Sequence, residues 1–206
     1  MNSKIKKSDT THLKNGGHTR GLSGFTLLEI IVSISLFAII IILVSSIYVM
    51  SQRSYNQNST QAELSQNARV AFDRLSRELR QSTGIVTALP ATDSDIFNPP
   101  ANQIFFQDGH DNSRLTYLKY YLDGTNLMRE HSSYYFNTEP GVDVYYDSLD
   151  LGGNLPLKDQ IENRVIGEYV SGMKFWGEDR IINFELSFLK NQKSFVLRSS
   201  VYSRNQ

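Results

Sequence analysis

An unbroken apolar run is the feature that most restricts this chain. The 21 residues from Ile30 to Met50 contain no charged side chain and no proline. A helix of about 20 apolar residues spans the hydrocarbon core of a bilayer, and serines within it can bond back to the helix backbone. Tyr48 stands near the far end of the run, where an interfacial aromatic residue is expected. The sequence therefore predicts a membrane-spanning helix.

A short basic segment precedes this run. Residues 1–24 hold five lysines and arginines against Asp9, a balance of +4, so the remainder carries −4 because the whole chain is neutral. A basic end beside an apolar helix predicts that this end stays in the cytoplasm and that the residues beyond the helix are extracytoplasmic. The acidic remainder has no basic stripe to neutralise phosphates, so we expect no direct nucleic-acid partner.

The composition argues against an enzyme. The chain has no cysteine, which excludes disulfides, thiol nucleophiles and cysteine-based zinc sites. His110 and His131 lack the spacing of a metal-binding motif, Ser132 beside His131 does not make a triad, and no glycine-rich phosphate loop is present. We predict no catalytic residue and no cofactor, and we expect both histidines to be exposed.

Glu29 immediately precedes the uncharged run and directly follows the stretch Gly24-Phe25-Thr26-Leu27-Leu28. A carboxylate at the start of a membrane-length helix is costly unless something pairs with it. An ordinary secretory signal has a shorter apolar region that is followed by a small-residue cleavage site, and no such site follows this run. The small residues precede it instead.

The basic leader, Gly24, Phe25 and Glu29 together resemble the class III signal of type IV prepilins and pseudopilins. The resemblance implies that a prepilin peptidase cleaves between Gly24 and Phe25 and N-methylates Phe25. The apolar segment then stays on the mature chain as its N-terminal helix. The resemblance also implies that Glu29 pairs with the N-terminal amine of a neighbouring subunit, since a paired buried charge costs much less than an isolated one.

Two plainer interpretations of this junction stay open. Phe25 and Glu29 are i and i+4 on a helix, so the pair can also form within one chain. Alternatively, the segment is a simple signal anchor, and Glu29 is solvated near the lipid headgroups.

The helical period continues beyond Met50 in a polar composition. An apolar stripe with spacings of four, four, three and four is formed by Leu64, Ala68, Phe72, Leu75 and Leu79. Charged residues populate the other faces, where Arg74 and Glu78 can form a surface i,i+4 pair. We expect one helix over residues 25–82, with Gly84 as its C-terminal stop.

Short strand-like segments follow the helix. Strands are expected at Gln103–Asp108, Leu115–Leu122, Leu127–Tyr135, Val165–Trp176, Ile181–Leu189 and Ser194–Ser203, with turns at Asp123–Asn126 and Lys190–Lys193. Proline and glycine make Leu89–Asn102 and Asn137–Asn163 irregular loops. The predicted fold class is α+β and pilin-like: a long N-terminal α-helix, transmembrane first and amphipathic second, packs on a C-terminal antiparallel β-sheet.

The predicted organisation has four parts. They are a cleaved leader (1–24), a transmembrane and assembly half-helix (25–50), an amphipathic half-helix (51–83) and a β-rich domain (84–206). In the last part, Asp143, Asp147 and Asp150 are candidate calcium ligands on a loop, although their spacing is not that of an EF-hand and a solvated acidic loop is the alternative. Seven tyrosines between residues 117 and 146 suit strand and loop packing, with a recognition surface as the alternative.

A second resemblance concerns the subgroup. Gln66-Asn67-Ala68-Arg69, the stretch Leu75 to Arg80, and Arg204-Asn205 near the C-terminus resemble PilW-like minor pilins and J-type minor pseudopilins of type II secretion. We expect a structural minor subunit of a type IV pilus, a secretion pseudopilus or a DNA-uptake pseudopilus, located first in the inner membrane and then in the filament.

Its expected partners are the prepilin peptidase/methyltransferase and other pilin or pseudopilin subunits, which it contacts through the N-terminal helix. One alternative is an uncleaved membrane anchor that carries an extracytoplasmic ligand-binding module. Another is a membrane-tethered hydrolase.

Overall fold

The computed structural model describes residues 24–111 and 113–203. The chain divides into two compact units, Met1–Ser51 and Gln52–Gln206. The helix α1 runs from Leu27 to Gln81 and contributes residues to both units. The leader up to Ser23 and the Arg204-Asn205 pair lie outside the described residues.

In the first unit, every described residue is exposed, including all the aliphatic side chains of α1. These side chains occur on all faces of the helix, so no described part of the chain covers them. The hydroxyls of Ser33, Ser35 and Ser46 bond back to carbonyls four residues earlier, at 2.7, 2.8 and 2.8 Å. These bonds leave the serines compatible with lipid. The helix is long and apolar enough to cross a membrane, which is consistent with a single-pass membrane protein.

In the second unit, the remainder of α1 is amphipathic, as the spacing predicted. Leu64, Ala68, Leu75 and Leu79 are buried, and Phe72 packs at the edge of the core. The predicted stop at Gly84 is wrong. The helix ends three residues earlier, at Gln81. The hydroxyl of the next residue, Ser82, donates a hydrogen bond to the Leu79 carbonyl at 2.8 Å. Gly84 instead opens the first strand.

Two antiparallel sheets complete the second unit. The first has the order β1-β2-β3-β4-β5 and contains β1 (Gly84–Ile85), β2 (Ile104–Gln107), β3 (Thr116–Asp123), β4 (Asn126–Tyr135) and β5 (Leu157–Gly167). The second has the order β6-β7-β8 and contains β6 (Val170–Glu178), β7 (Ile181–Lys190) and β8 (Lys193–Tyr202). The α+β class is confirmed, but the sequence predicted one sheet where the protein has two.

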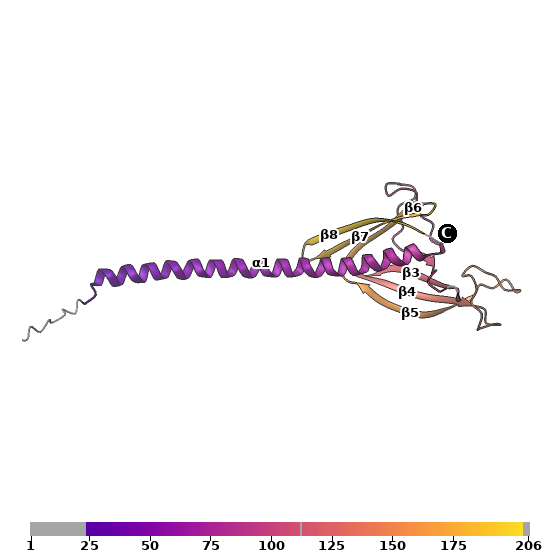
Figure 1. Ribbon diagram of the computed structural model, residues 1–206, viewed down its shortest axis with the longest axis horizontal. Helices are drawn as coiled ribbons and strands as arrows, with labels where there is room; N and C mark the ends of the chain where they lie inside the picture. Colours follow the sequence, from indigo (N-terminus) through magenta and orange to yellow (C-terminus); the bar gives the residue numbers. More distant parts are fainter. Residues whose placement is uncertain (1–23, 112, 204–206) are drawn as a thin grey trace, which may run out of the picture. The chain divides into compact units, whose positions relative to one another are not determined.

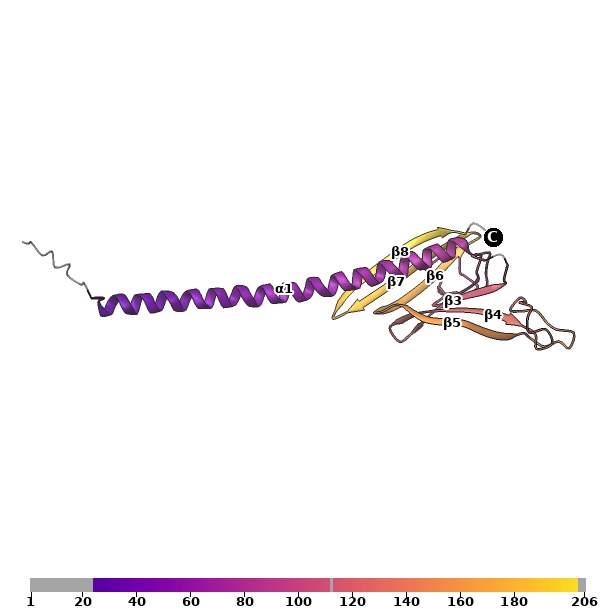
Figure 2. The same ribbon diagram turned by 60° about the horizontal axis from the view of Figure 1, so that its bottom comes forward.

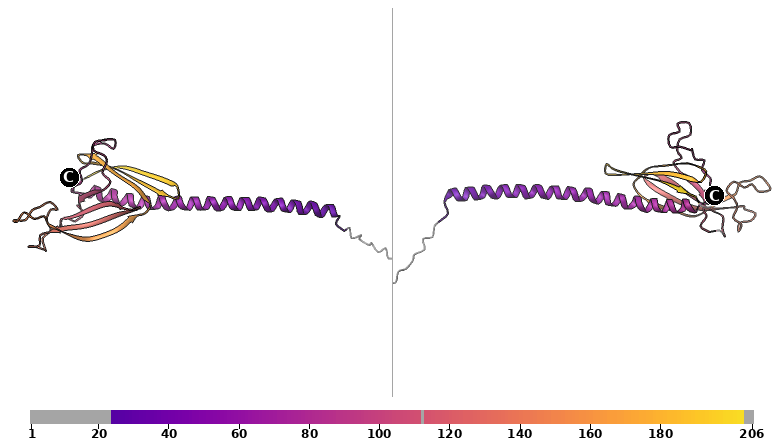
Figure 3. Two further views of the ribbon diagram at one scale, coloured as in Figure 1. Left: turned by 180° about the vertical axis from the view of Figure 1, so that it is seen from behind. Right: turned by 45° about the horizontal axis from the view of Figure 1, so that its top comes forward.

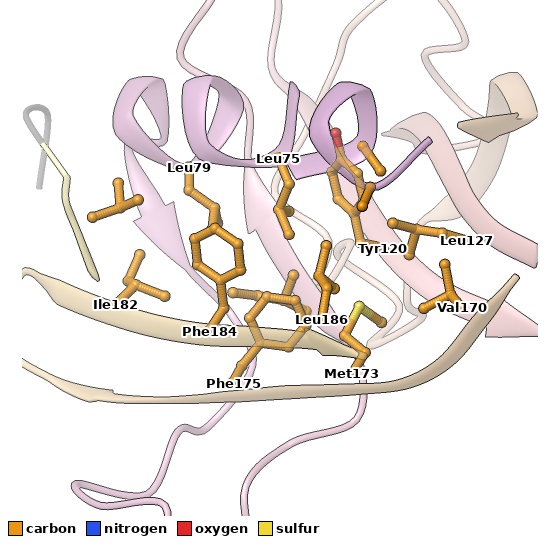
Figure 4. Close-up of a cluster of buried hydrophobic side chains, with 14 of the residues drawn as sticks. Leu75, Leu79, Tyr120, Leu127, Val170, Met173, Phe175, Ile182, Phe184 and Leu186 are labelled. Carbon is orange, nitrogen blue, oxygen red and sulfur yellow. The ribbon is translucent and has the colours of Figure 1, made fainter. Parts of the chain in front are cut away.

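The core lies between the second half of α1 and the two sheets. Strands β3 to β5 lie along one side of this half-helix and β6 to β8 along another, as Figures 1 and 2 show, and the views in Figure 3 agree. Leu75 and Leu79 project from α1 toward Phe184 and Leu186 of β7 (Figure 4). The amphipathic face of one helix thus buries the inner faces of both sheets.

The two predicted hairpins are confirmed. The β3–β4 loop has Gly124 at a φ of 60°, and the β7–β8 loop has Asn191 and Gln192 at 47° and 65°. Left-handed residues at a two-residue loop match the twist of the flanking strands.

The region around residues 157–176 is predicted less well. The single expected strand Val165–Trp176 is broken at Tyr169, where φ is 62°, and β5 begins at Leu157 inside the predicted loop. Strand β5 is an edge strand exposed on both faces, so its sequence shows no alternation.

Candidate functional site

The start of α1 is built by a helix cap that the sequence analysis missed. Gly24, Phe25 and Thr26 are non-helical and exposed. The Thr26 carbonyl accepts the Ile30 amide at 3.2 Å, and its hydroxyl accepts the Glu29 amide at 3.3 Å. These are the bonds of an N-cap residue. The signal was present in the sequence, because Thr26 and Glu29 have the spacing of a capping box.

Glu29 occupies the first turn of α1, which is where the helix dipole favours a negative charge. The residue is exposed, and its carboxylate has no hydrogen-bond or ion-pair partner among residues 24–111 and 113–203. Phe25, four residues earlier, is 76% exposed. The described part of a single chain therefore leaves both the carboxylate and the aromatic side chain free for other molecules.

The peptide bond between Gly24 and Phe25 lies outside the helix. A Cβ added to Gly24 would meet no atom within 4 Å, so no contact in the described part of the chain requires glycine there. A non-helical, exposed bond is what an enzyme needs for access to the backbone, because a helical backbone has its polar groups already paired. This geometry permits cleavage at that point.

Two of the three candidate calcium ligands, Asp143 and Asp150, bind different partners. Asp143 forms a bidentate pair with Arg114 at 3.0 and 3.2 Å. Asp150 accepts the backbone N–H groups of Gly152 and Asn154 at 2.8 Å, and the bonds from Asn154 hold the pKa of Asp150 below its usual range. Within the described ranges, no group of three or more His, Asp or Glu side chains is arranged to hold a metal ion.

Four aromatic side chains, three from the first sheet and one from a loop, form a cluster outside the main core. Tyr117 contacts Phe105, Tyr134 and Tyr146, with ring centroids 5.3, 5.5 and 5.6 Å apart. Tyr146 comes from the loop between β4 and β5, so the cluster fastens that loop to the sheet. These tyrosines serve packing, as their positions predicted.

The end of α1 holds a buried polar cluster where the sequence predicted a surface ion pair. Glu78 pairs with Arg74 as expected, at 3.1 Å, but it is buried and also accepts Nε of Arg129 at 3.0 Å and the hydroxyl of Tyr120. The expectation of a surface position was wrong because β3 and β4 cover this face of the helix. Burial raises the pKa of Glu78, but the bonds from Arg129 and Tyr120 outweigh it and leave the pKa below the usual range.

The two histidines differ. His110 is exposed, as expected. His131 is half-buried on β4, with Nε2 buried and 3.9 Å from Oδ2 of Asp108. Burial and the nearby Arg129 charge lower the pKa of His131. The expected exposure of His131 was wrong because its strand lies in the middle of a sheet that packs against α1.

Comparison with models of known protein families finds no match for this chain. A search of curated proteins likewise finds none. What the fold and the site establish is an α+β protein with one N-terminal helix long and apolar enough to cross a membrane.

Proposed function

We propose that this chain is a structural subunit of the type IV pilin and pseudopilin class. In this proposal, a prepilin peptidase cleaves it between Gly24 and Phe25 and N-methylates Phe25. The mature chain then leaves the inner membrane and joins a pilus or pseudopilus through the first half of α1. The leader stays in the cytoplasm and the β-rich part is extracytoplasmic. Within the class, the subgroup resemblance favours a minor subunit.

The observation that carries the proposal is the uncovered first half of α1 together with its free carboxylate. Apolar side chains on all faces from Leu27 to Met50 are exposed in the single chain. Such a surface is stable only in lipid or against similar helices. A subunit that exchanges lipid for neighbouring helices satisfies the apolar surface at both stages.

The carboxylate supports the same proposal. Glu29 has no partner in the described part of its own chain, and a charge that enters an apolar helix bundle needs one. Cleavage after Gly24 would create an amine on Phe25, and the same amine on a neighbouring copy could pair with Glu29. The processing step would thus supply the opposite charge that assembly requires.

The first test is the mass of the N-terminus. We would express the full chain in bacteria with and without a functional prepilin peptidase, extract it from membranes and determine its intact mass. We expect a chain that begins with N-methyl-Phe25 only when the enzyme is present. An intact leader in cells that carry the enzyme would instead support the uncleaved membrane-anchored binding module.

Gly24 offers a clean variant for this test. A Cβ at this position meets nothing within 4 Å in the described part of the chain, and Gly24 is exposed outside the helix, so Gly24→Ala and Gly24→Leu leave the packed core unchanged. A loss of cleavage in either variant therefore reports on recognition by the enzyme. We expect Gly24→Ala to be cleaved in part and Gly24→Leu not at all.

Assembly is tested separately with Glu29→Gln, which removes the charge and keeps the shape. We expect normal cleavage but a strong loss from sheared filaments or from crosslinked pseudopilus complexes. Ser33→Ala is the matched control, because Ser33 lies one turn further along and its hydroxyl is already satisfied by the Glu29 carbonyl. Normal incorporation of Glu29→Gln would refute the assembly role.

A further inference from the structure

A pocket of about 370 Å³ lies beside the last two turns of α1. Its walls come from α1, from the segment that follows β2, and from β3 and β4. We call it the helix-end pocket. Its volume is within the range of small-ligand sites. The charged side chains that line it are the guanidinium groups of Arg74, Arg77 and Arg129 and the carboxylates of Glu78 and Asp108.

Three of the four carboxylate oxygens of Glu78 and Asp108 already accept a hydrogen bond, and the fourth, Oδ2 of Asp108, lies 3.9 Å from Nε2 of His131. Both oxygens of Glu78 accept Nε of Arg129 at 3.0 Å, and they also accept Arg74 and Tyr120. Oδ1 of Asp108 accepts the backbone N–H of His110 at 3.0 Å. A pocket whose acceptors are taken offers little to a cation.

The arginines, by contrast, keep unused donors. Arg74 uses only Nε and Arg129 uses Nε and Nη1, the latter toward Glu162 at 2.7 Å. Arg77 is exposed, and within the described ranges its guanidinium has no hydrogen-bond or ion-pair partner. Planar N–H forks of this kind match carboxylate and phosphate oxygens. The surplus in this pocket is therefore one of charged donors.

We propose that the helix-end pocket binds a small oxyanion of the phosphate or carboxylate type, held by Arg77 and by the free N–H groups of Arg74 and Arg129. Three arginines face two carboxylates on the lining, and a third carboxylate, Glu162, shares Arg129 from β5. The site is thus close to neutral when empty and does not repel an anion. This site is independent of the function proposed above.

His131 couples the site to pH, because its ring lines the same pocket. The charged and titratable groups that surround it are Arg74, Arg77, Glu78, Asp108, His110, Arg129 and Glu162. Burial and Arg129 disfavour the imidazolium in the empty pocket. A bound anion adds a negative charge near His131 and favours its imidazolium form. His131 therefore takes up a proton when the anion binds. Affinity must therefore rise as the pH falls through the range in which His131 titrates.

The test uses the full chain in detergent micelles with ¹³C-labelled histidine. Sodium sulfate and sodium acetate are the probes, since both keep their charge between pH 6 and pH 8, and sodium chloride at equal ionic strength is the blank. We expect a saturable shift of the His131 resonance, identified by its loss in His131→Gln, and affinity at pH 6 at least roughly threefold above that at pH 8. Saturation by sulfate alone assigns a phosphate-type group, and saturation by acetate alone assigns a carboxylate. Either result supports the site.

Arg77→Gln should weaken saturation roughly tenfold, because it removes a charge-assisted donor pair. Arg77→Lys keeps the charge but loses the planar pair of N–H donors. Its affinity for the anion should lie between those of Arg77→Gln and the natural chain. Arg80→Gln is the matched control, since Arg80 is exposed in the last turn of α1, three residues after Arg77, but does not line the pocket. Unchanged fluorescence of Trp176 verifies the fold of each variant. A non-saturable response, an equal response to chloride, or an equal loss in Arg80→Gln would overturn the proposal.

Discussion

The buried cluster at the end of α1 should make the packing of the helix on the first sheet depend on one ion pair. The variant we propose is Arg129→Met, which keeps an unbranched apolar stem and removes the guanidinium. Its partner Glu78 would remain buried, with only Tyr120 and Arg74 as donors. Since the Arg129 and Glu78 side chains are only 9% and 11% exposed, water from the helix-end pocket replaces the lost bonds only in part.

The expected loss follows from this burial. Removing one partner of a buried pair typically costs about 3–5 kcal/mol, and the two remaining donors of Glu78 place this case at about 3 kcal/mol. Glu78→Leu leaves the buried Arg129 without its main partner, although the ion pair with Glu162 remains. We expect a similar loss of stability, about 3 kcal/mol. The double variant strands neither charge. It should therefore lose no more than either single variant, about 3 kcal/mol, which leaves a coupling energy of about 3 kcal/mol.

The assay is urea unfolding of the full chain in detergent micelles, followed by the fluorescence of Trp176, the single tryptophan. The pKa of Glu78 is lower in the folded chain. The contribution of the cluster is therefore present above the unfolded-state pKa of about 4.3 and is lost as the pH falls through the folded-state pKa. Arg129→Met should flatten this acid dependence. Additive single variants, or an unchanged acid dependence, would refute the reasoning.

Three further outcomes are expected. Gly109→Ala should destabilise the fold by about 2 kcal/mol or more, because the new Cβ would lie 2.0 Å from the carbonyl oxygen of Gln81, the last residue of α1. The control in the same urea titration is Gly141→Ala, whose Cβ meets nothing within 4 Å. Leu75→Ala should cost about 3 kcal/mol through the cavity that it leaves, whereas the exposed Val70→Ala should cost under about 0.5 kcal/mol. Thr26→Val should weaken the start of α1 by about 1 kcal/mol, measured as faster hydrogen exchange of the first-turn amides, and Thr26→Ser should preserve protection.

Much of the fold could be predicted from local pattern alone. The apolar stripe of the second half of α1 and the two hairpin turns depend on residues close in sequence, so period and turn chemistry were enough. Strand β5 was missed over its first residues because an edge strand exposed on both faces carries no alternation. The division into two sheets also had no local signal. It depends on which strands pair with one another in space, and no short stretch of sequence reveals that.

The features that need no distant partner can be predicted from the sequence alone. These are the apolar span, the carboxylate of Glu29 at its start and the amphipathic stripe, because each is a property of consecutive turns of one helix. The surroundings of Glu78 and His131 depend on the tertiary structure. Tyr120 and Arg129, the strand residues that contact Glu78, are 42 and 51 residues away in the chain, and Asp108 is 23 residues from His131. Burial by β3 and β4 converts an apparent surface pair into a buried ion cluster. Burial depends on contacts between distant segments, which the order of residues along one helix does not reveal.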